Sequence, residues 1–184
     1  MNTLEGGARV ACPVTLPDLG LRAISTQGVL LALSAAVLPA VSHLANLPVR
    51  WLLPMHWAVL LAGLTYGWRA GMAVGLLAPG ASFLLSGMPL PHILPAMTVE
   101  LAAYGFVAGF ARQAWRFGQV ASMALAVVAG RVVFVVVALS TGAATPGVSA
   151  YLKAALLPGL AAAAAQVALL PLVARWWIRR ESRR

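Results

Sequence analysis

The chain is short of charge, and of acidic charge above all: it has 4 Asp+Glu against 13 Lys+Arg, and only 9% of its 184 residues are charged. An ordinary soluble domain has about 25% charged residues, so these side chains are too few to coat a soluble particle of this size. Hydrophobic residues make up 61% of the sequence, which excludes disorder. A net charge of +9 often indicates a nucleic-acid-binding protein. The basic patch of such a protein lies on a polar surface, however, and this sequence has too few polar residues to form one. The composition therefore indicates an integral membrane protein, whose medium is the lipid bilayer and which has no nucleic-acid partner.

Two further absences narrow the chemistry. Cys12 is the only cysteine, so neither a disulfide within the chain nor a cysteine-based metal site can form. No glycine-rich loop ending in Lys-Ser/Thr is present, and such a loop is what cradles nucleotide phosphates in many ATPases. If the protein moves a solute uphill, the energy must come from an ion gradient or from another polypeptide. We expect no cofactor.

Six apolar stretches approach the length of about 20 residues that a membrane-spanning helix needs. They run approximately over residues 23–46, 52–68, 70–86, 93–111, 118–140 and 151–176. Arg69 and Gly71 mark a tight turn after the short second stretch, and the Pro and Gly content of residues 87–92 and 141–150 predicts loops. We expect an all-α integral membrane protein with a six-transmembrane-helix bundle over residues 23–178, an N-terminal tail over 1–22 and a basic tail over 179–184. The alternative is that the second and third stretches form one hairpin that only dips into the bilayer.

The positive residues fall on one side of this topology. Six spans place both chain ends on the same side, and that side receives ten arginines, whereas the other side receives only Arg50 and Lys153. Short loops rich in Lys and Arg stay in the cytoplasm, so both termini are predicted to be cytoplasmic and the protein to be multi-pass in a prokaryotic plasma membrane. The ten are Arg9, Arg22, Arg69, Arg112, Arg116, Arg175, Arg179, Arg180, Arg183 and Arg184.

Small residues recur every four positions on several stretches, a spacing that stacks them on one helix face. Ala32, Ala36 and Ala40 do so on the first stretch. Glycines recur at the same spacing on the second, third and fourth apolar stretches. They are Gly63, Gly67, Gly71, Gly75, Gly105 and Gly109. Small residues let helices approach closely in lipid. Packing within the bundle and docking of a partner's helices both remain open for these faces.

Two ionisable residues, Glu100 and Arg131, fall well inside predicted spans. Charges at such depth usually face the bundle interior, are paired, and mark functional sites. At 1.5 Å per residue, Glu100 lies about 10 Å and Arg131 about 13 Å below the same membrane surface. Similar depth predicts that they pair. The pair is either a structural ion pair, or a site in which Arg131 grips a carbonyl or anionic group of a ligand and Glu100 orients it.

The three histidines, His43, His56 and His92, cluster in the outer half of the expected bundle. Three histidines can bind a metal, but no two are four residues apart and no carboxylate neighbours them. Hydrogen bonding or ligand contact is therefore the prediction, and no metal site. Trp57 beside His56, and Tyr104 one turn below Glu100, add the apolar walls that a small-molecule pocket needs.

Five segments of the sequence carry a resemblance to one known protein family. They are residues 53–63 (LPMHWAVLLAG), 71–79 (GMAVGLLAP), 86–89 (SGMP), 99–105 (VELAAYG) and 107–109. Together they resemble the S components of energy-coupling factor (ECF) transporters, the substrate-capturing subunits of vitamin importers. The similarity is closest to a branch with the pattern LPMHxPVLLAG…TGMP…MxxELxxYG. This chain departs from that pattern at Trp57, Ala58, Ser86 and Ala103, which border the expected pocket. The substrate of that branch is therefore not inferred to be the substrate of this chain.

The resemblance implies a six-helix protein that binds its ligand from outside and topples in the membrane, driven by two ATPase subunits. The pocket would be lined by residues 46–52, 86–92 and 141–150. Ala32, Ala36 and Ala40 would contact the coupling helices of the ECF transmembrane subunit. Together with the residues discussed above, this gives a predicted substrate-binding set of Glu100, Arg131, His56, His92, Trp57, Tyr104 and His43.

Two rival functions fit the same sequence. One is a solitary facilitator of micronutrient uptake that needs no ATPase, and the other is a small intramembrane enzyme that uses Glu100 and the histidines. The substrate also stays open. Arg131 favours a carboxylate-bearing or carbonyl-rich vitamin such as pantothenate or biotin, Glu100 permits a cationic thiamine-like one, and the histidines permit a corrinoid.

Overall fold

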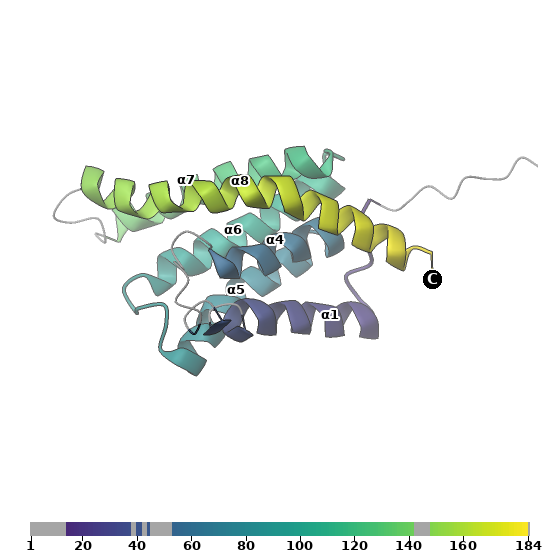
Figure 1. Ribbon diagram of the computed structural model, residues 1–184, viewed down its shortest axis with the longest axis horizontal. Coiled ribbons are helices and arrows are strands. Elements are labelled where there is room, and N and C mark those ends of the chain that lie inside the picture. The colour runs from purple at the N-terminus through teal and green to yellow at the C-terminus, as the bar shows by residue number, and fades with distance from the viewer. Residues whose placement is uncertain (1–13, 38–39, 42–43, 45–52, 142–147, 184) are drawn as a thin grey trace, which may run out of the picture.

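The computed structural model describes residues 14–37, 40–41, 44, 53–141 and 148–183, and within these ranges the chain is helical and contains no strand (Figure 1). The predicted all-α helical bundle is confirmed. Helix α1 continues directly into the π-helical segment η1, so the two count as the first of six helices. The elements are α1 (Leu21–Ala32), η1 (Leu33–Val37), α4 (Pro54–Tyr66), α5 (Trp68–Ser86), α6 (Leu94–Gln113), α7 (Gln119–Ser140) and α8 (Val148–Glu181).

The helix boundaries follow the proline and glycine signals closely, with one correction. The turn between α4 and α5 lies at Gly67, and Arg69 and Gly71 are already inside α5. Gly67 has φ 94, a backbone conformation that L-residues with a side chain avoid. A single residue therefore suffices to end one helix and begin the next. The predicted loop at 87–92 is confirmed, whereas residues 142–147 of the predicted loop at 141–150 lie outside the described residues. The last three residues of that predicted loop are helical, because α8 already begins at Val148.

Helix α8 is longer than its predicted span, because it continues through Arg179 and Arg180 to Glu181. It also holds Pro158 and Pro171 in its interior. Proline removes one backbone donor from a helix, and transmembrane helices tolerate this where neighbouring groups compensate. The first residues of the segment predicted to be a basic tail are thus part of a membrane helix.

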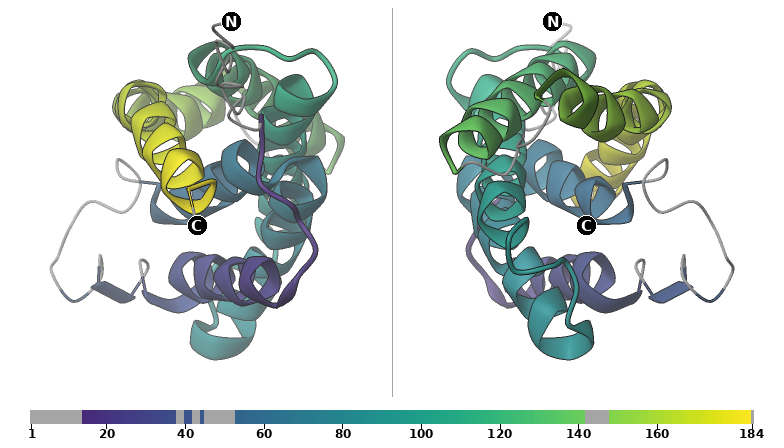
Figure 2. Two further views of the ribbon diagram at one scale, coloured as in Figure 1. Left: turned by 90° about the vertical axis from the view of Figure 1, so that its right-hand side faces the viewer. Right: turned by 90° about the vertical axis from the view of Figure 1, so that its left-hand side faces the viewer.

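Helix α4 is the centre of the bundle. Twelve of its 13 residues are buried, and it contacts α1, η1, α5, α6, α7 and α8. Figure 2, which views the bundle along its length, shows α4 enclosed between α1 on one side and α6 and α8 on the others. A helix that is apolar on every side needs to be surrounded by other helices. Any polar side chain on α4, such as His56, is consequently carried into the interior.

The recurring glycines hold α4, α5 and α6 together. A methyl group added to Gly63 on α4 would lie 2.6 Å from the carbonyl oxygen of Gly105 on α6. Gly105 and Gly71 on α5 also meet backbone to backbone, and a methyl group on Gly75 would overlap the backbone of Leu101. Of the two interpretations left open for these glycines, packing within the bundle is confirmed, since all of them are buried.

Within the described ranges, four helical segments are long and apolar enough to cross a bilayer: Trp68–Ser86, Leu94–Gln113, Gln119–Ser140 and Leu157–Glu181. Their outer surfaces carry large apolar side chains, among them Val128 and Val132 on α7 and Leu160 on α8, each more than half exposed. Exposed apolar surface of this extent is typical of contact with lipid. The first helix and α4 are shorter, and α4 relies on its neighbours for cover.

Residues 14–16 tie several helix ends together at one end of the bundle. The Leu16 amide donates to the carbonyl of Thr65 at 2.7 Å, and Arg112 Nη2 donates to the carbonyl of Val14 at 2.6 Å. At the same end an ion pair of 3.7 Å joins Arg22 on α1 to Glu181 on α8. The start of α1 and the end of α8 therefore lie together (Figure 1). We call this the arginine-rich end, because Arg22, Arg112, the three arginines of α8 and Arg183 just beyond α8 gather there.

Candidate functional site

The predicted pair of intramembrane charges exists. Glu100 on α6 is 3% exposed, and Arg131 Nη1 on α7 donates a hydrogen bond to its Oε1 oxygen at 3.2 Å. The two residues belong to neighbouring antiparallel helices that are joined by a short turn, and they lie at similar depth on the sides that face each other. The pairing inferred from depth is confirmed, and whether the pair also binds a ligand is a separate question.

His56 joins the same carboxylate from a third helix. Its Nε2 atom lies 3.7 Å from Glu100 Oε1, so Arg131 and His56 approach one oxygen from two sides. The His56 ring also meets the ring of Tyr104 edge-on, with centroids 5.0 Å apart and an interplanar angle of 74°. Tyr104 lies one turn along α6 from Glu100 and is buried. Three helices thus bring together what we call the polar cluster: His56, Glu100, Tyr104 and Arg131.

Two glycines shape the walls of the polar cluster. The ring of Tyr104 lies against Gly130 on α7, at 2.8 Å from where a methyl group would be. The guanidinium of Arg131 lies against Gly159 on α8, close to the side chain of Leu53. Because Gly130 has no side chain, the ring of Tyr104 can lie against α7. Because Gly159 has none, the guanidinium of Arg131 can lie against α8. The role of Gly159 was not predicted, and the only signal for it in the sequence is the Pro158-Gly159 step inside an alanine-rich helix.

Three buried nitrogen atoms of the polar cluster have no hydrogen-bond partner. Arg131 Nη2 is buried and has no hydrogen-bond partner, and neither ring nitrogen of His56 has one. Buried polar atoms without a partner are costly and uncommon enough that each needs an explanation. A guanidinium presents two parallel N–H groups that match a carboxylate or a carbonyl oxygen. The cluster can therefore hold an acceptor group, and it offers no activated nucleophile with an adjacent base.

The remaining predicted site residues are more scattered. Trp57 is partly buried and packs against the apolar core next to His56. His92 is exposed in the turn before α6, and His43 lies outside the described residues. Over the part of the chain that the structure describes, no group of three His, Cys, Asp or Glu side chains could hold a metal ion. The structure thus unites His56, Tyr104, Glu100 and Arg131, and leaves His92 apart from them.

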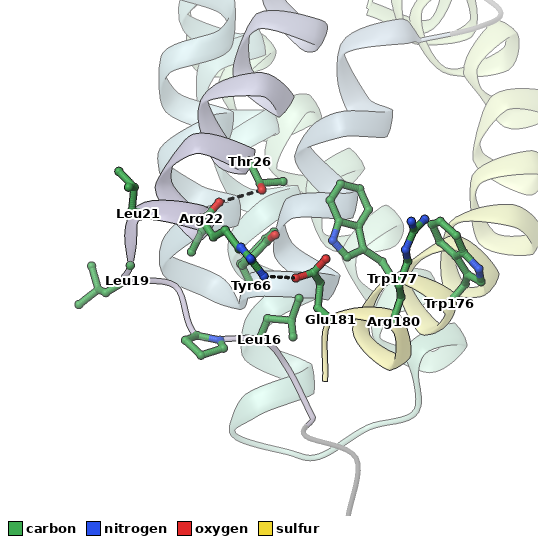
Figure 3. Close-up of a pocket in the computed structure, with 13 residues that line it drawn as sticks. Leu16, Leu19, Leu21, Arg22, Thr26, Tyr66, Trp176, Trp177, Arg180 and Glu181 are labelled. Atoms are coloured by element: carbon green, nitrogen blue, oxygen red, sulfur yellow. Dashed lines mark hydrogen bonds and ion pairs between the residues drawn. The ribbon is translucent and has the colours of Figure 1, made fainter. Parts of the chain in front are cut away.

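A cavity of about 700 Å³ opens at the arginine-rich end, away from the polar cluster. It lies between the start of α1, the end of α4 and the end of α8, and Arg22, Arg180 and Glu181 provide its charges (Figure 3). Tyr66, Trp176 and Trp177 supply its aromatic lining. We did not predict this cavity. The pairing of Trp176-Trp177 with arginines indicated only a membrane-interface belt.

A second hollow of about 620 Å³ adjoins the first cavity on the outer face of α8. The two share Trp176 and Arg180. Neither contacts the polar cluster, so the site indicated by buried charge and the hollows indicated by shape are different places. The residues of the second hollow are Leu172, Arg175, Trp176, Arg179, Arg180 and Arg183.

The helices and their apolar outer surfaces define a multi-pass protein of the cell membrane. The family model of the ECF transporter substrate-specific component matches residues 22–175. The chain belongs to that family: it is a substrate-binding membrane subunit of a transporter, and the family is a transporter component rather than an enzyme. The sequence resemblance is thereby confirmed at the level of the family. A search of curated proteins and a search of solved structures each gave no match.

Proposed function

We propose that this chain captures a vitamin or related micronutrient on the outer side of the membrane and delivers it through an ECF coupling subunit and two ATPase subunits. Membership of the family supports a substrate-binding role. The single observation that carries the ligand site is the polar cluster, in which Arg131 Nη2 and both ring nitrogens of His56 are buried without a hydrogen-bond partner.

The unpartnered guanidinium nitrogen of Arg131 also favours one class of substrate. Arg131 and His56 both offer N–H groups, whereas Glu100 already accepts from Arg131. A ligand that brings a carboxylate or carbonyl oxygen would satisfy these donors, and a cationic ligand would not. We therefore favour an acceptor-rich micronutrient that is contacted by Arg131, His56 and Tyr104. Trp57, His92 and His43 stay predicted substrate contacts.

Mass spectrometry of the small molecules that co-purify with the membrane-extracted protein tests this proposal. We expect one carboxylate-bearing or carbonyl-rich molecule at close to one per chain. Uptake of that molecule should require co-expression of the coupling and ATPase subunits. Equal uptake in cells without any such module would overturn the ECF mechanism in favour of the solitary facilitator. Turnover of the bound molecule that is lost in Glu100→Gln would favour an intramembrane enzyme.

The alanine face of the first helix provides the docking prediction. Ala32 at the end of α1 and Ala40 beyond η1 are exposed, and Ala36 in η1 is partly exposed, so among the described residues these alanines are open to contact with another helix, unlike the buried glycines. Leucine at all three positions would keep the coupling helices from approaching closely. We expect the variant with Ala32→Leu, Ala36→Leu and Ala40→Leu to lose transport while retaining its co-purified ligand.

A matched control makes that result specific. Ala161, Ala164 and Ala168 are exposed alanines on one face of α8, and their replacement by leucine adds the same apolar volume elsewhere. We expect that control to transport normally. If ligand retention falls together with transport in the first-helix variant, the alanine face is structural and the docking assignment is wrong.

A further inference from the structure

The second hollow, on the outer face of α8, has the composition of an anion site. Four guanidinium groups, those of Arg175, Arg179, Arg180 and Arg183, line it, and among the residues that the structure describes no carboxylate does. The neighbouring Glu181 lines the first cavity, where it pairs with Arg22. We call this hollow the α8 arginine groove.

The groove places like charges along the last turns of α8 and just beyond its end. Arg175 and Arg179 are four residues apart within α8, where like charges repel, and Arg183 follows two residues after the helix ends at Glu181. All of them are exposed, and among the described residues none of them forms an ion pair. An anion seated between them would offset the repulsion. Guanidinium groups suit phosphate in particular, because they bind it in a bidentate manner.

The surface next to the groove is apolar and continues along the same helix. Leu169 and Leu172 are 50% and 60% exposed, and Trp176 is 59% exposed. Leu169 and Arg180 are separated by about 16 Å along the helix axis, which is close to one leaflet of the roughly 30 Å hydrocarbon core. Acyl chains beside Leu169 and Leu172 would therefore bring a headgroup to the level of the guanidiniums.

Trp176 marks the boundary between these two environments. Arg180 stacks over its ring, with its guanidinium carbon 5.2 Å from the ring centroid. Tryptophan at the junction of apolar and polar surface is typical of the membrane interface, and the cation–π contact holds one guanidinium at that level.

We propose that the α8 arginine groove binds the phosphodiester headgroup of an anionic phospholipid in the leaflet at the arginine-rich end. Charge complementarity, the absence of a carboxylate and the adjoining apolar strip all favour a lipid over a free anion, since only a lipid uses both parts of the surface. The site is separate from the polar cluster and does not depend on the proposed micronutrient. A bound lipid there would fasten the end of α8 to one leaflet.

Native mass spectrometry of the delipidated full chain in detergent tests the proposal, with phosphatidylglycerol and phosphatidylcholine of identical acyl chains as probes. We expect at least a tenfold preference for phosphatidylglycerol. Each basic residue near an anionic surface contributes about fivefold, so Arg179→Gln with Arg183→Gln should weaken phosphatidylglycerol binding by about 30-fold. The matched control, Arg69→Gln with Arg116→Gln, removes the same charge elsewhere and should leave binding unchanged.

Four results would overturn the assignment. Equal binding of the two lipids would exclude a headgroup site, and equal losses in the two double variants would show diffuse attraction rather than a groove. Displacement of the lipid by inorganic phosphate at equal concentration would indicate a free-anion site. If the Arg179 and Arg183 variant keeps its lipid but no longer co-purifies with the coupling subunit, the groove is a protein interface.

Discussion

Alanine at Gly105 is expected to destabilise the protein severely. The position lies on α6 where its backbone touches the backbone of Gly71 on α5, and a methyl group there would overlap the Gly71 carbonyl. Overpacking costs about 1–3 kcal/mol, and a clash between two backbones belongs at the upper limit because neither side can rotate away. For a chain of this size about 3 kcal/mol corresponds to a fall in Tm of roughly 6–12 °C. Thermal unfolding in detergent measures it.

Gly80 provides the matched control, because it lies in the same helix as Gly71 but has open space around it. Nothing lies within 4 Å of where its methyl group would be. Alanine is a better helix former than glycine by roughly 0.5–1 kcal/mol, so Gly80→Ala should leave Tm unchanged or raise it slightly. Gly71→Ala should resemble Gly105→Ala. The double variant should cost less than the sum, since one opening of the helix pair accommodates both methyl groups. Equal Tm values for Gly80→Ala and Gly105→Ala would contradict the close packing.

The sequence predicted most of the fold because membrane helices are long, apolar and interrupted by few residue types. Proline and glycine placed the loop at 87–92, and depth arithmetic placed Glu100 beside Arg131. The turn at Gly67 was missed by a few residues, because three glycines and an arginine stood close together and only the backbone shows which glycine has a positive φ. The end of α8 was missed because charged residues can continue a helix beyond the hydrocarbon core.

The polar cluster was predicted only in part. Sequence spacing shows that Tyr104 lies one turn from Glu100, but it does not fix how α4 is rotated. The rotation of α4 brings His56 to the Glu100 carboxylate, and it depends on the close approach of Gly63 to Gly105. Likewise, the contact between Arg131 and Gly159 requires the register of α7 against α8, which no local pattern specifies. Long-range packing therefore decided that His56 belongs to the cluster and that His92 does not.

Arg131→Gln is expected to reduce ligand retention at least tenfold and to destabilise the protein as well. Removing the guanidinium takes away the principal donor to a ligand acceptor group, and it also leaves the buried Glu100 carboxylate without its 3.2 Å partner. Breaking a buried pair from one side costs about 3–5 kcal/mol. The two effects must be separated, because an unstable protein also loses its ligand. The measurements are Tm and the amount of co-purified small molecule per chain.

The double variant, Arg131→Gln with Glu100→Gln, separates them. It removes both charges, so no uncompensated ion remains in the interior, and we expect Tm to recover most of what Arg131→Gln lost. Ligand retention should stay at least tenfold low, because the guanidinium is still absent. Arg112→Gln is the matched control: this partly buried arginine on α6 bonds to backbone carbonyls at the arginine-rich end, so its loss should affect Tm without selectively lowering ligand retention. If the double variant recovers both stability and ligand, Glu100 and Arg131 form only a structural pair, and the micronutrient binds elsewhere.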